Sequence, residues 1–113
     1  MASPIQSLTD ATFAQAIRDA TRPVLVDFGA RWCPPCKAML PSLEAIARER
    51  ADVVVVAIDV DDAPGVAGTF GVRAMPTLLL FRVGQPVAQL VGGQSRARLD
   101  AWLDVHLSKA RVA

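Results

Sequence analysis

Two short apolar segments, with a long amphipathic one between them, constrain the fold most strongly. Residues 24–28 and 53–58 are rich in β-branched side chains and almost free of polar ones, which is typical of strands covered on both faces. Between them, apolar side chains from Cys36 to Ala47 recur every three or four positions, which predicts a long helix that ends near Arg50. A strand, a helix and a second strand in this order form a parallel crossover. The sequence therefore predicts an α/β fold.

The segments on either side complete a mixed sheet with helices on both faces. A helix is expected over residues 13–20, with Thr9 as its cap and Asp10 as an acid in its first turn. A short helix is expected after the acidic loop that follows the second strand. Residues 77–81 and 87–91 are predicted to pair as a hairpin, which adds an antiparallel edge to the sheet. A final amphipathic helix is expected to follow the hairpin.

Length and composition fit one domain without a nucleic-acid or membrane role. The chain has 113 residues, 52% hydrophobic and 20% charged, so we expect a single domain over residues 1–113 that buries its own core. A formal net charge of +1 argues against a nucleic-acid or anionic-membrane binder. No apolar run approaches the roughly 20 residues that cross a bilayer. The segment from Met1 to Pro4 lacks the features of a secretory signal, so we expect a cytoplasmic protein, and we expect a monomer.

The only two cysteines of the chain stand at the start of the predicted long helix, in the sequence WCPPCK at positions 32–37. Because a residue before proline avoids the helical conformation, we expect Cys33 and Pro34 to precede the helix and Pro35 to begin it. Cys36 then lies in the first turn, and the positive end of the helix dipole faces Cys33 and stabilises a thiolate there. This geometry predicts that Cys33 is the nucleophile and that Cys36 resolves its mixed disulfide.

Three chemical roles are open to the cysteine pair: thiol–disulfide exchange, a metal site and a structural disulfide. A closed zinc site needs four ligands, and beyond the pair the chain offers only His106 and carboxylates, which the predicted elements keep apart unless a dimer shares two pairs. The acids among residues 59–62 are interpreted as a solvated turn. A structural bridge over so short a loop adds little stabilisation. Exchange is favoured, with no bound cofactor and the Cys33–Cys36 disulfide as the redox centre.

One carboxyl group interrupts the first buried strand. Burial of Asp27 would disfavour its charged form, raise its pKa and make the carboxyl a proton carrier near neutral pH. The alternative is that the strand ends early and that Asp27 reaches water.

These features together resemble the thioredoxin family from about Leu8 to Leu107. The matching segments are Val26-Asp27-Phe28, Trp32-Cys33-x-x-Cys36-Lys37, Pro41, Met75-Pro76-Thr77 and Val91-Gly92. The resemblance implies the thioredoxin fold, a four- or five-stranded mixed sheet flanked by helices, and the reduction of protein disulfides with electrons from a thioredoxin-reductase-like protein. It also implies that Cys33 attacks, that Cys36 resolves and that Asp27 manages the proton of Cys36.

The same resemblance implies a substrate-binding surface beside the pair. It implies a cis peptide bond before Pro76, which would turn the Met75 backbone toward the cysteines, where it can hydrogen-bond an extended substrate. We interpret Trp32 as an exposed wall for incoming peptides, with packing beside the loop as the alternative. Gly92 is expected to line a shallow recognition groove with Met75, or else to serve as a backbone turn.

Four positions depart from the residues that are usual in the family. Where members usually have glycine, tryptophan, isoleucine and lysine, this chain has Pro34, Gly29, Met75 and Ala57. Pro34 removes an amide that could point at sulfur, and Ala57 removes a possible charge partner of Asp27. We expect the catalytic class to survive these changes better than the redox potential. Two alternatives therefore remain: an oxidant or disulfide isomerase of an oxidising compartment, and a redox-inactive binding module with the same fold.

Overall fold

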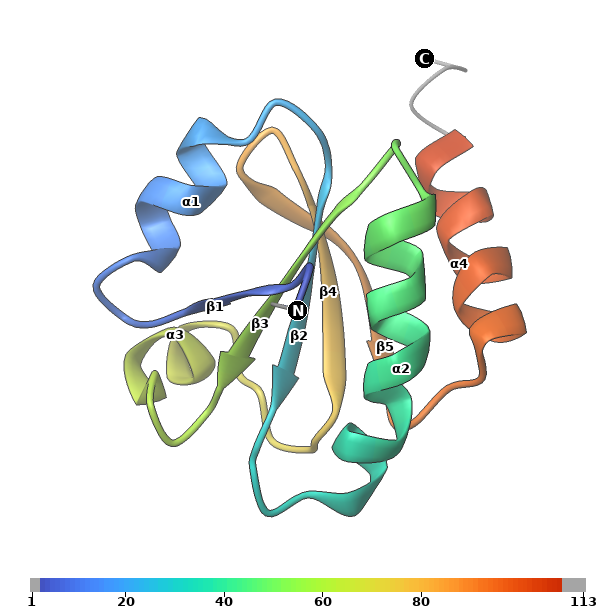
Figure 1. The fold of residues 1–113 in the computed structure, drawn as a ribbon. Helices are drawn as coiled ribbons and strands as arrows, with labels where there is room; N and C mark the ends of the chain where they lie inside the picture. Colours follow the sequence, from blue (N-terminus) through green and yellow to red (C-terminus); the bar gives the residue numbers. More distant parts are fainter. Residues whose placement is uncertain (1–2, 109–113) are drawn as a thin grey trace.

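The chain folds around a five-stranded sheet with the order β1-β3-β2-β4-β5 (Figure 1). The computed structural model describes residues 3–108, so Met1 and Ala2, in the segment where we expect no leader, lie outside it. Within that range, no helix has the length and apolar character needed to span a membrane. The elements, in chain order, are β1 (Gln6–Leu8), α1 (Phe13–Asp19), β2 (Val24–Gly29), α2 (Pro34–Glu49), β3 (Val54–Asp59), α3 (Pro64–Thr69), β4 (Thr77–Arg82), β5 (Gln85–Val91) and α4 (Arg96–Ser108).

Parallel pairing on one side of the sheet gives way to antiparallel pairing on the other. β3 lies between β1 and β2 and pairs with both in parallel, with Val24 of β2 opposite Val54. β4 pairs antiparallel with β2 on one side and with β5 on the other, where the two strands form the hairpin. The predicted parallel crossover, antiparallel edge and mixed sheet are confirmed.

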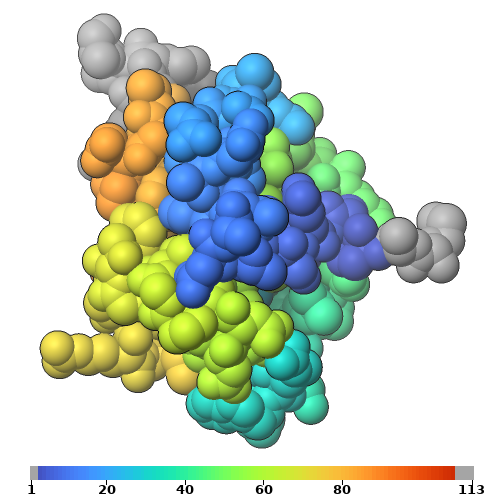
Figure 2. Space-filling view, turned by 90° about the vertical axis from the view of Figure 1, so that its left-hand side faces the viewer, coloured from blue at the N-terminus to red at the C-terminus, as the bar shows by residue number. Residues whose placement is uncertain are grey.

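Alternating strand side chains serve two separate helical layers. In β2, Val26 and Phe28 pack into a core with α1 and α3, whereas Leu25 packs into a core with α2 and α4. Figure 2 shows the side of the molecule that α1 and α3 cover, with α1 in blue beside α3 in yellow-green. Because successive side chains of a strand point to opposite faces, Asp27 is directed to the α2 face, together with Leu25. The sheet therefore aims this carboxyl toward the helix that carries the cysteines.

The amino-terminal segment differs from the sequence-based prediction. The N-cap residue of α1 is Thr12 rather than Thr9, and the N–H of Thr9 donates a hydrogen bond of 2.9 Å to the Thr12 hydroxyl oxygen. Asp10 is not in the first turn of α1. Its carboxylate instead accepts hydrogen bonds from the N–H groups of Gly65 at 3.1 Å and Val66 at 2.8 Å. Asp10 thus caps the short helix α3. The pairing of β1 with β3 brings Asp10, which follows β1, close to α3, which follows β3.

The β4–β5 hairpin closes through a two-residue turn at Val83 and Gly84. Their φ angles, 51° and 78°, both lie in the left-handed region, as a type I′ turn requires. Gly84 adopts this conformation without a steric penalty, whereas the β-branched side chain of Val83 is fully exposed in it. The tight turn lets β5 begin at Gln85, two residues before the predicted strand.

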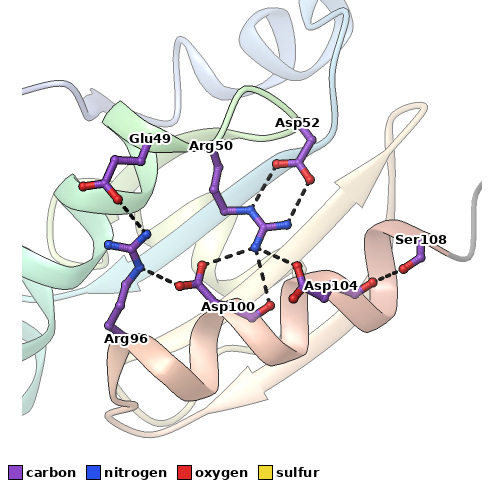
Figure 3. A network of polar contacts seen from close by, with 7 residues as sticks. All are labelled: Glu49, Arg50, Asp52, Arg96, Asp100, Asp104 and Ser108. Carbon is purple, nitrogen blue, oxygen red and sulfur yellow. Dashed lines mark hydrogen bonds and ion pairs between the residues drawn. The ribbon is translucent and has the colours of Figure 1, made fainter.

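A polar network joins the end of α2 to α4 (Figure 3). The Arg50 guanidinium is only 16% exposed and contacts the carboxylates of Asp52 at 2.9 Å, Asp100 at 3.2 Å and Asp104 at 2.9 Å. Arg96 contacts the other oxygen of Asp100 at 2.8 Å and reaches the last residue of α2. These contacts lie beside the apolar core that α2 and α4 share. They hold α4 against the end of α2 that is remote from the cysteines.

Candidate active site

The cysteine pair lies where the loop after β2 enters α2. Cys33 and Cys36 form a disulfide, with their Cα atoms 5.3 Å apart, and both residues are buried. Cys33 is the N-cap residue, in an extended conformation, and Pro34 is the first residue of the helix. The prediction that Pro34 precedes the helix is therefore wrong by one residue. Its fixed φ suits the first helical position, where the absence of an N–H group removes no hydrogen bond.

The first turn of α2 directs one backbone amide at the Cys33 sulfur. The N–H of Cys36 donates to Cys33 Sγ at 3.3 Å. Because Pro34 and Pro35 have no N–H group, this is the first amide of the helix that can reach the sulfur. The amide and the positive end of the helix dipole both stabilise negative charge on Cys33 Sγ. Once the disulfide is reduced, this sulfur is the one that the helix favours as a thiolate.

The segment around Pro76 lies against the pair. The Met75–Pro76 bond is cis, as the resemblance implied. The Met75 carbonyl oxygen is 3.7 Å from Cys33 Sγ, a contact rather than a hydrogen bond while the sulfur is in a disulfide. Gly92 donates its N–H to the Pro76 carbonyl oxygen at 2.8 Å and has a φ of 95°, so a residue with a side chain would be strained there. Val60, which sequence reasoning missed, packs on the pair together with Met75.

Trp32 stands beside the pair and is 61% exposed. Its indole N–H donates a hydrogen bond of 2.7 Å to Asp61. The backbone N–H of Arg31 donates to Asp59 at 3.0 Å, and the Arg31 guanidinium binds both carboxylate oxygens of Asp62. The acids at the end of β3 and in the loop after it therefore fix the Trp32 segment, so they form more than the solvated turn that the sequence suggested. These contacts join residues 28 to 31 positions apart, so no local pattern could reveal them.

Asp27 lies buried on β2, on the side of the sheet that faces α2. It is 7% exposed, and its Oδ1 has no hydrogen-bond partner among the described residues. Loss of solvation raises the pKa of this carboxyl to about 7. Since β2 continues past it to Gly29, the alternative that the strand ends before Asp27 is wrong. A Cβ atom added to Gly29 would lie 3.4 Å from Cys36 Sγ and 3.9 Å from Asp27 Oδ1, so both groups border one small space.

The group that the structure places at this site is the redox-active disulfide itself. Across residues 3–108, no three or more histidine, cysteine or acidic side chains gather in a way that could hold a metal ion.

Comparison with known proteins identifies the family. A family model described as Thioredoxin matches residues 4–105. The chain belongs to the thioredoxin family. It is 50% identical over 98 residues to the thioredoxin of Alicyclobacillus acidocaldarius subsp. acidocaldarius, across 86% of this chain and 92% of that protein. It is 50% identical over 93 residues to the thioredoxin of Mycobacterium bovis, across 81% and 80%. It is 43% identical over 102 residues to thioredoxin 1 of Synechococcus elongatus, across 89% and 95%.

Family membership and the bonded cysteine pair make this thioredoxin-family protein a thiol–disulfide oxidoreductase, with the reduction of protein disulfides as its reaction. The mixed sheet, with α1 and α3 on one face and α2 and α4 on the other, is the thioredoxin fold. The family implies protein disulfides as substrates and a reductase protein as electron donor. The predicted family, fold and enzyme class are confirmed. The comparisons favour neither the oxidant or isomerase nor the redox-inactive binding module.

Proposed function

We propose that Cys33 is the attacking sulfur and Cys36 the resolving sulfur of a protein-disulfide reductase that acts as a single domain. The Cys33 thiolate attacks one sulfur of the substrate disulfide, which breaks as a mixed disulfide forms, and the first substrate thiolate leaves and takes up a proton. Cys36 then loses its proton and attacks Cys33 Sγ, so that the mixed disulfide breaks and the second substrate thiolate leaves. The substrate gains two electrons, and Cys33 and Cys36 lose two electrons as they form their disulfide.

The single observation that carries this order of attack is the 3.3 Å hydrogen bond from the Cys36 N–H to Cys33 Sγ. A sulfur that accepts a helical amide at the N-cap position is the better thiolate of the two. Cys36, inside the first turn, has no corresponding position at the helix end. The assignment of attack to Cys33 and of resolution to Cys36 follows from this asymmetry.

Asp27 is the group to which Cys36 gives up its proton. A carboxyl with a pKa of about 7 is present in both protonation states at neutral pH, so it can accept and release a proton within one cycle. The space in front of Gly29, which borders both Cys36 Sγ and Asp27 Oδ1, supports this transfer. The carboxyl then returns its proton to a departing thiolate or to water.

An extended segment of the substrate docks across Trp32, Met75, Pro76 and Gly92. The exposed indole of Trp32 and the position of the Met75 carbonyl oxygen, 3.7 Å from Cys33 Sγ, support this surface. Backbone pairing at Met75 would bind the substrate as an added strand, independently of its side chains. Such binding suits an enzyme that reduces more than one protein.

A thioredoxin-reductase-like protein returns two electrons to the disulfide, and no bound cofactor takes part. We place the protein in the cytoplasm, where the reducing environment keeps such a pair reduced between turnovers, and we expect it to act as a monomer. The net charge of +1 supports the absence of nucleic-acid and membrane partners.

The test is the reduction of insulin disulfides by dithiothreitol in the presence of the protein. The wild-type chain should accelerate the reaction, Cys33→Ser should abolish the acceleration, and Cys36→Ser should accumulate a mixed disulfide through Cys33. No acceleration by the wild-type chain would favour a binding module, and accumulation in Cys33→Ser instead would reverse the roles. A reduction potential near roughly −270 mV, the established value for thioredoxin, supports a reductant, whereas about −120 to −180 mV supports an oxidant or isomerase.

A further inference from the structure

A cavity of about 660 Å³ opens on the α2 face of the sheet, and none of the four residues proposed to dock protein substrates lines it. It lies between β1, the carboxyl ends of β2 and β3, and the first half of α2. Asp27 and Cys36 both belong to its wall. Its size suits a small molecule rather than a folded partner.

Two small residues keep the space in front of Asp27 open. Ala57 lies opposite Asp27 in the pairing of β2 with β3 and lines the cavity with a methyl group. Gly29 leaves free the position 3.4 Å from Cys36 Sγ and 3.9 Å from Asp27 Oδ1 that a Cβ atom would occupy. A larger side chain at position 57 would fill this space.

The carboxyl at this position lacks a hydrogen-bond donor. Asp27 is 7% exposed and Oδ1 has no partner within residues 3–108. A buried carboxyl that lacks a donor costs free energy, and a ligand that donates a hydrogen bond to the part of Asp27 that lines the cavity recovers some of that cost. Asp27 is therefore the anchor that the cavity offers to a ligand.

The charge of the wall selects a cation. The cavity is lined by four carboxyl groups but only two basic groups: Asp27, Glu44, Asp59 and Asp62 against Arg31 and Lys37. Arg31 binds Asp62 at 2.9 and 3.1 Å and lies 3.5 Å from Asp59, so it offsets only one of these two acids, and Lys37 can offset only one of Asp27 and Glu44. The remaining field is acidic, which attracts a positive ligand and disfavours an anion.

The rest of the wall is apolar. Ile5, just before β1, Leu40 of α2 and Ala57 of β3 provide it. A ligand with one cationic end and a short alkyl chain fits both parts of the cavity, because burial of the chain removes apolar surface from water.

We propose that this cavity is a binding site for a small organic ammonium ion, which donates hydrogen bonds to the Asp27 carboxylate and packs its alkyl chain on the apolar wall. Binding does not require that Asp27 carry a proton in catalysis, nor that Cys33 be the attacking sulfur. Because binding is measured in the oxidised protein without turnover, its result is independent of the proposed function.

The experiment is a nuclear magnetic resonance titration of the oxidised protein with propylammonium chloride and, as the neutral control of matched shape, 1-propanol. At about pH 8.5, Asp27 is ionised and the ammonium, with a pKa near the ~10.4 of lysine, keeps its charge. Propylammonium should shift the amide signals of Gly29, Cys36 and Ala57 saturably and bind at least about tenfold more tightly than 1-propanol. Sodium chloride at the same ionic strength should not shift these signals.

Two variants locate the binding. Asp27→Asn should remove the preference for propylammonium over 1-propanol, and Ala57→Leu should weaken the binding of both by filling the cavity. Equal affinity of the two compounds for the wild-type chain, no saturable shift with propylammonium, or an unchanged preference in Asp27→Asn would each overturn the proposal. If Ala57→Leu does not fold, the comparison of the two compounds on the wild-type chain and on Asp27→Asn still tests the proposal.

Discussion

Asp27 lies directly opposite Ala57 in the parallel pairing of β2 and β3, so a buried carboxyl faces a methyl group. Its Oδ1 has no hydrogen-bond partner within residues 3–108, and loss of solvation raises its pKa to about 7 from an ordinary value of 3.8. The folded protein therefore favours the neutral form of this side chain, whereas the unfolded chain ionises it readily.

Asp27→Asn should stabilise the protein in a pH-dependent way. Between about pH 4 and 7 the folded chain holds a proton that the unfolded chain has lost, so the wild-type stability falls as the pH rises through this range. Above pH 7 the loss is complete and is on the order of 4 kcal/mol. The variant should therefore exceed the wild-type free energy of unfolding by up to that amount at about pH 8 and match it near pH 4. Urea unfolding of both oxidised proteins measures this, and an equal difference at the two pH values would contradict it.

The same substitution should slow the reduction of insulin near neutral pH. Without a carboxyl to take the proton of Cys36, resolution of the mixed disulfide should fall about tenfold, less than a full general-base effect because water can replace the carboxyl. The rate profile should also lose its inflection near pH 7. Stopped-flow measurements across this pH range test the change, with the oxidised variant's circular dichroism as a control for folding. An inflection that persists in Asp27→Asn removes Asp27 from the mechanism.

Periodicity in the sequence located the elements that form the core. The buried strands β2 and β3 and the helix α2 are long enough for their apolar spacing to identify them. β1 escaped prediction because a three-residue strand with one buried side chain, Leu8, has no detectable alternation. Asp10 was assigned to the nearest helix, whereas it caps α3, 55 residues along the chain. Pairings of this kind depend on the packed fold and leave no local signal.

The site was predictable to the extent that its chemistry is local. Cys33 and Cys36 belong to one helical turn, so helix geometry alone indicated which sulfur faces the amides. Burial of Asp27 followed from the apolar residues beside it, but the open space in front of it depends on Gly29 and on a residue of the neighbouring strand. The role of the acidic loop after β3 likewise required the structure.

Asp61→Ala should weaken the docking of substrate without altering the cysteines. Loss of the 2.7 Å hydrogen bond frees the Trp32 indole, and one such bond is worth about 1 kcal/mol, so KM for insulin should rise about fivefold with kcat nearly unchanged. Hydrogen exchange of the indole N–H should become faster. Asp61→Asn keeps an acceptor oxygen and should remain close to wild type. A change in kcat with KM unaffected would contradict a positioning role for Asp61.

Arg50→Ala should destabilise the fold and leave the chemistry intact. The substitution removes a largely buried guanidinium from three carboxylates and leaves those acids close together, so the free energy of unfolding should fall by about 2 kcal/mol (Figure 3). The difference should shrink in high salt. Arg48→Ala, at an exposed position in the same helical turn, is the matched control and should change stability by less than about 0.5 kcal/mol. Equal effects of the two substitutions would show that the network contributes nothing.

The pH dependence of alkylation of the reduced protein tests the central claim most directly. Iodoacetamide should react first at Cys33, and mass spectrometry locates the modified sulfur. The pKa of the Cys33 thiol should lie at least about one unit below the ~8.5 of free cysteine. Cys36 should react slowly, because its sulfur lies inside the first turn of α2 and lacks the N-cap amide. Modification of Cys36 first, or of both sulfurs at equal rates with a pKa near ~8.5, would contradict the account.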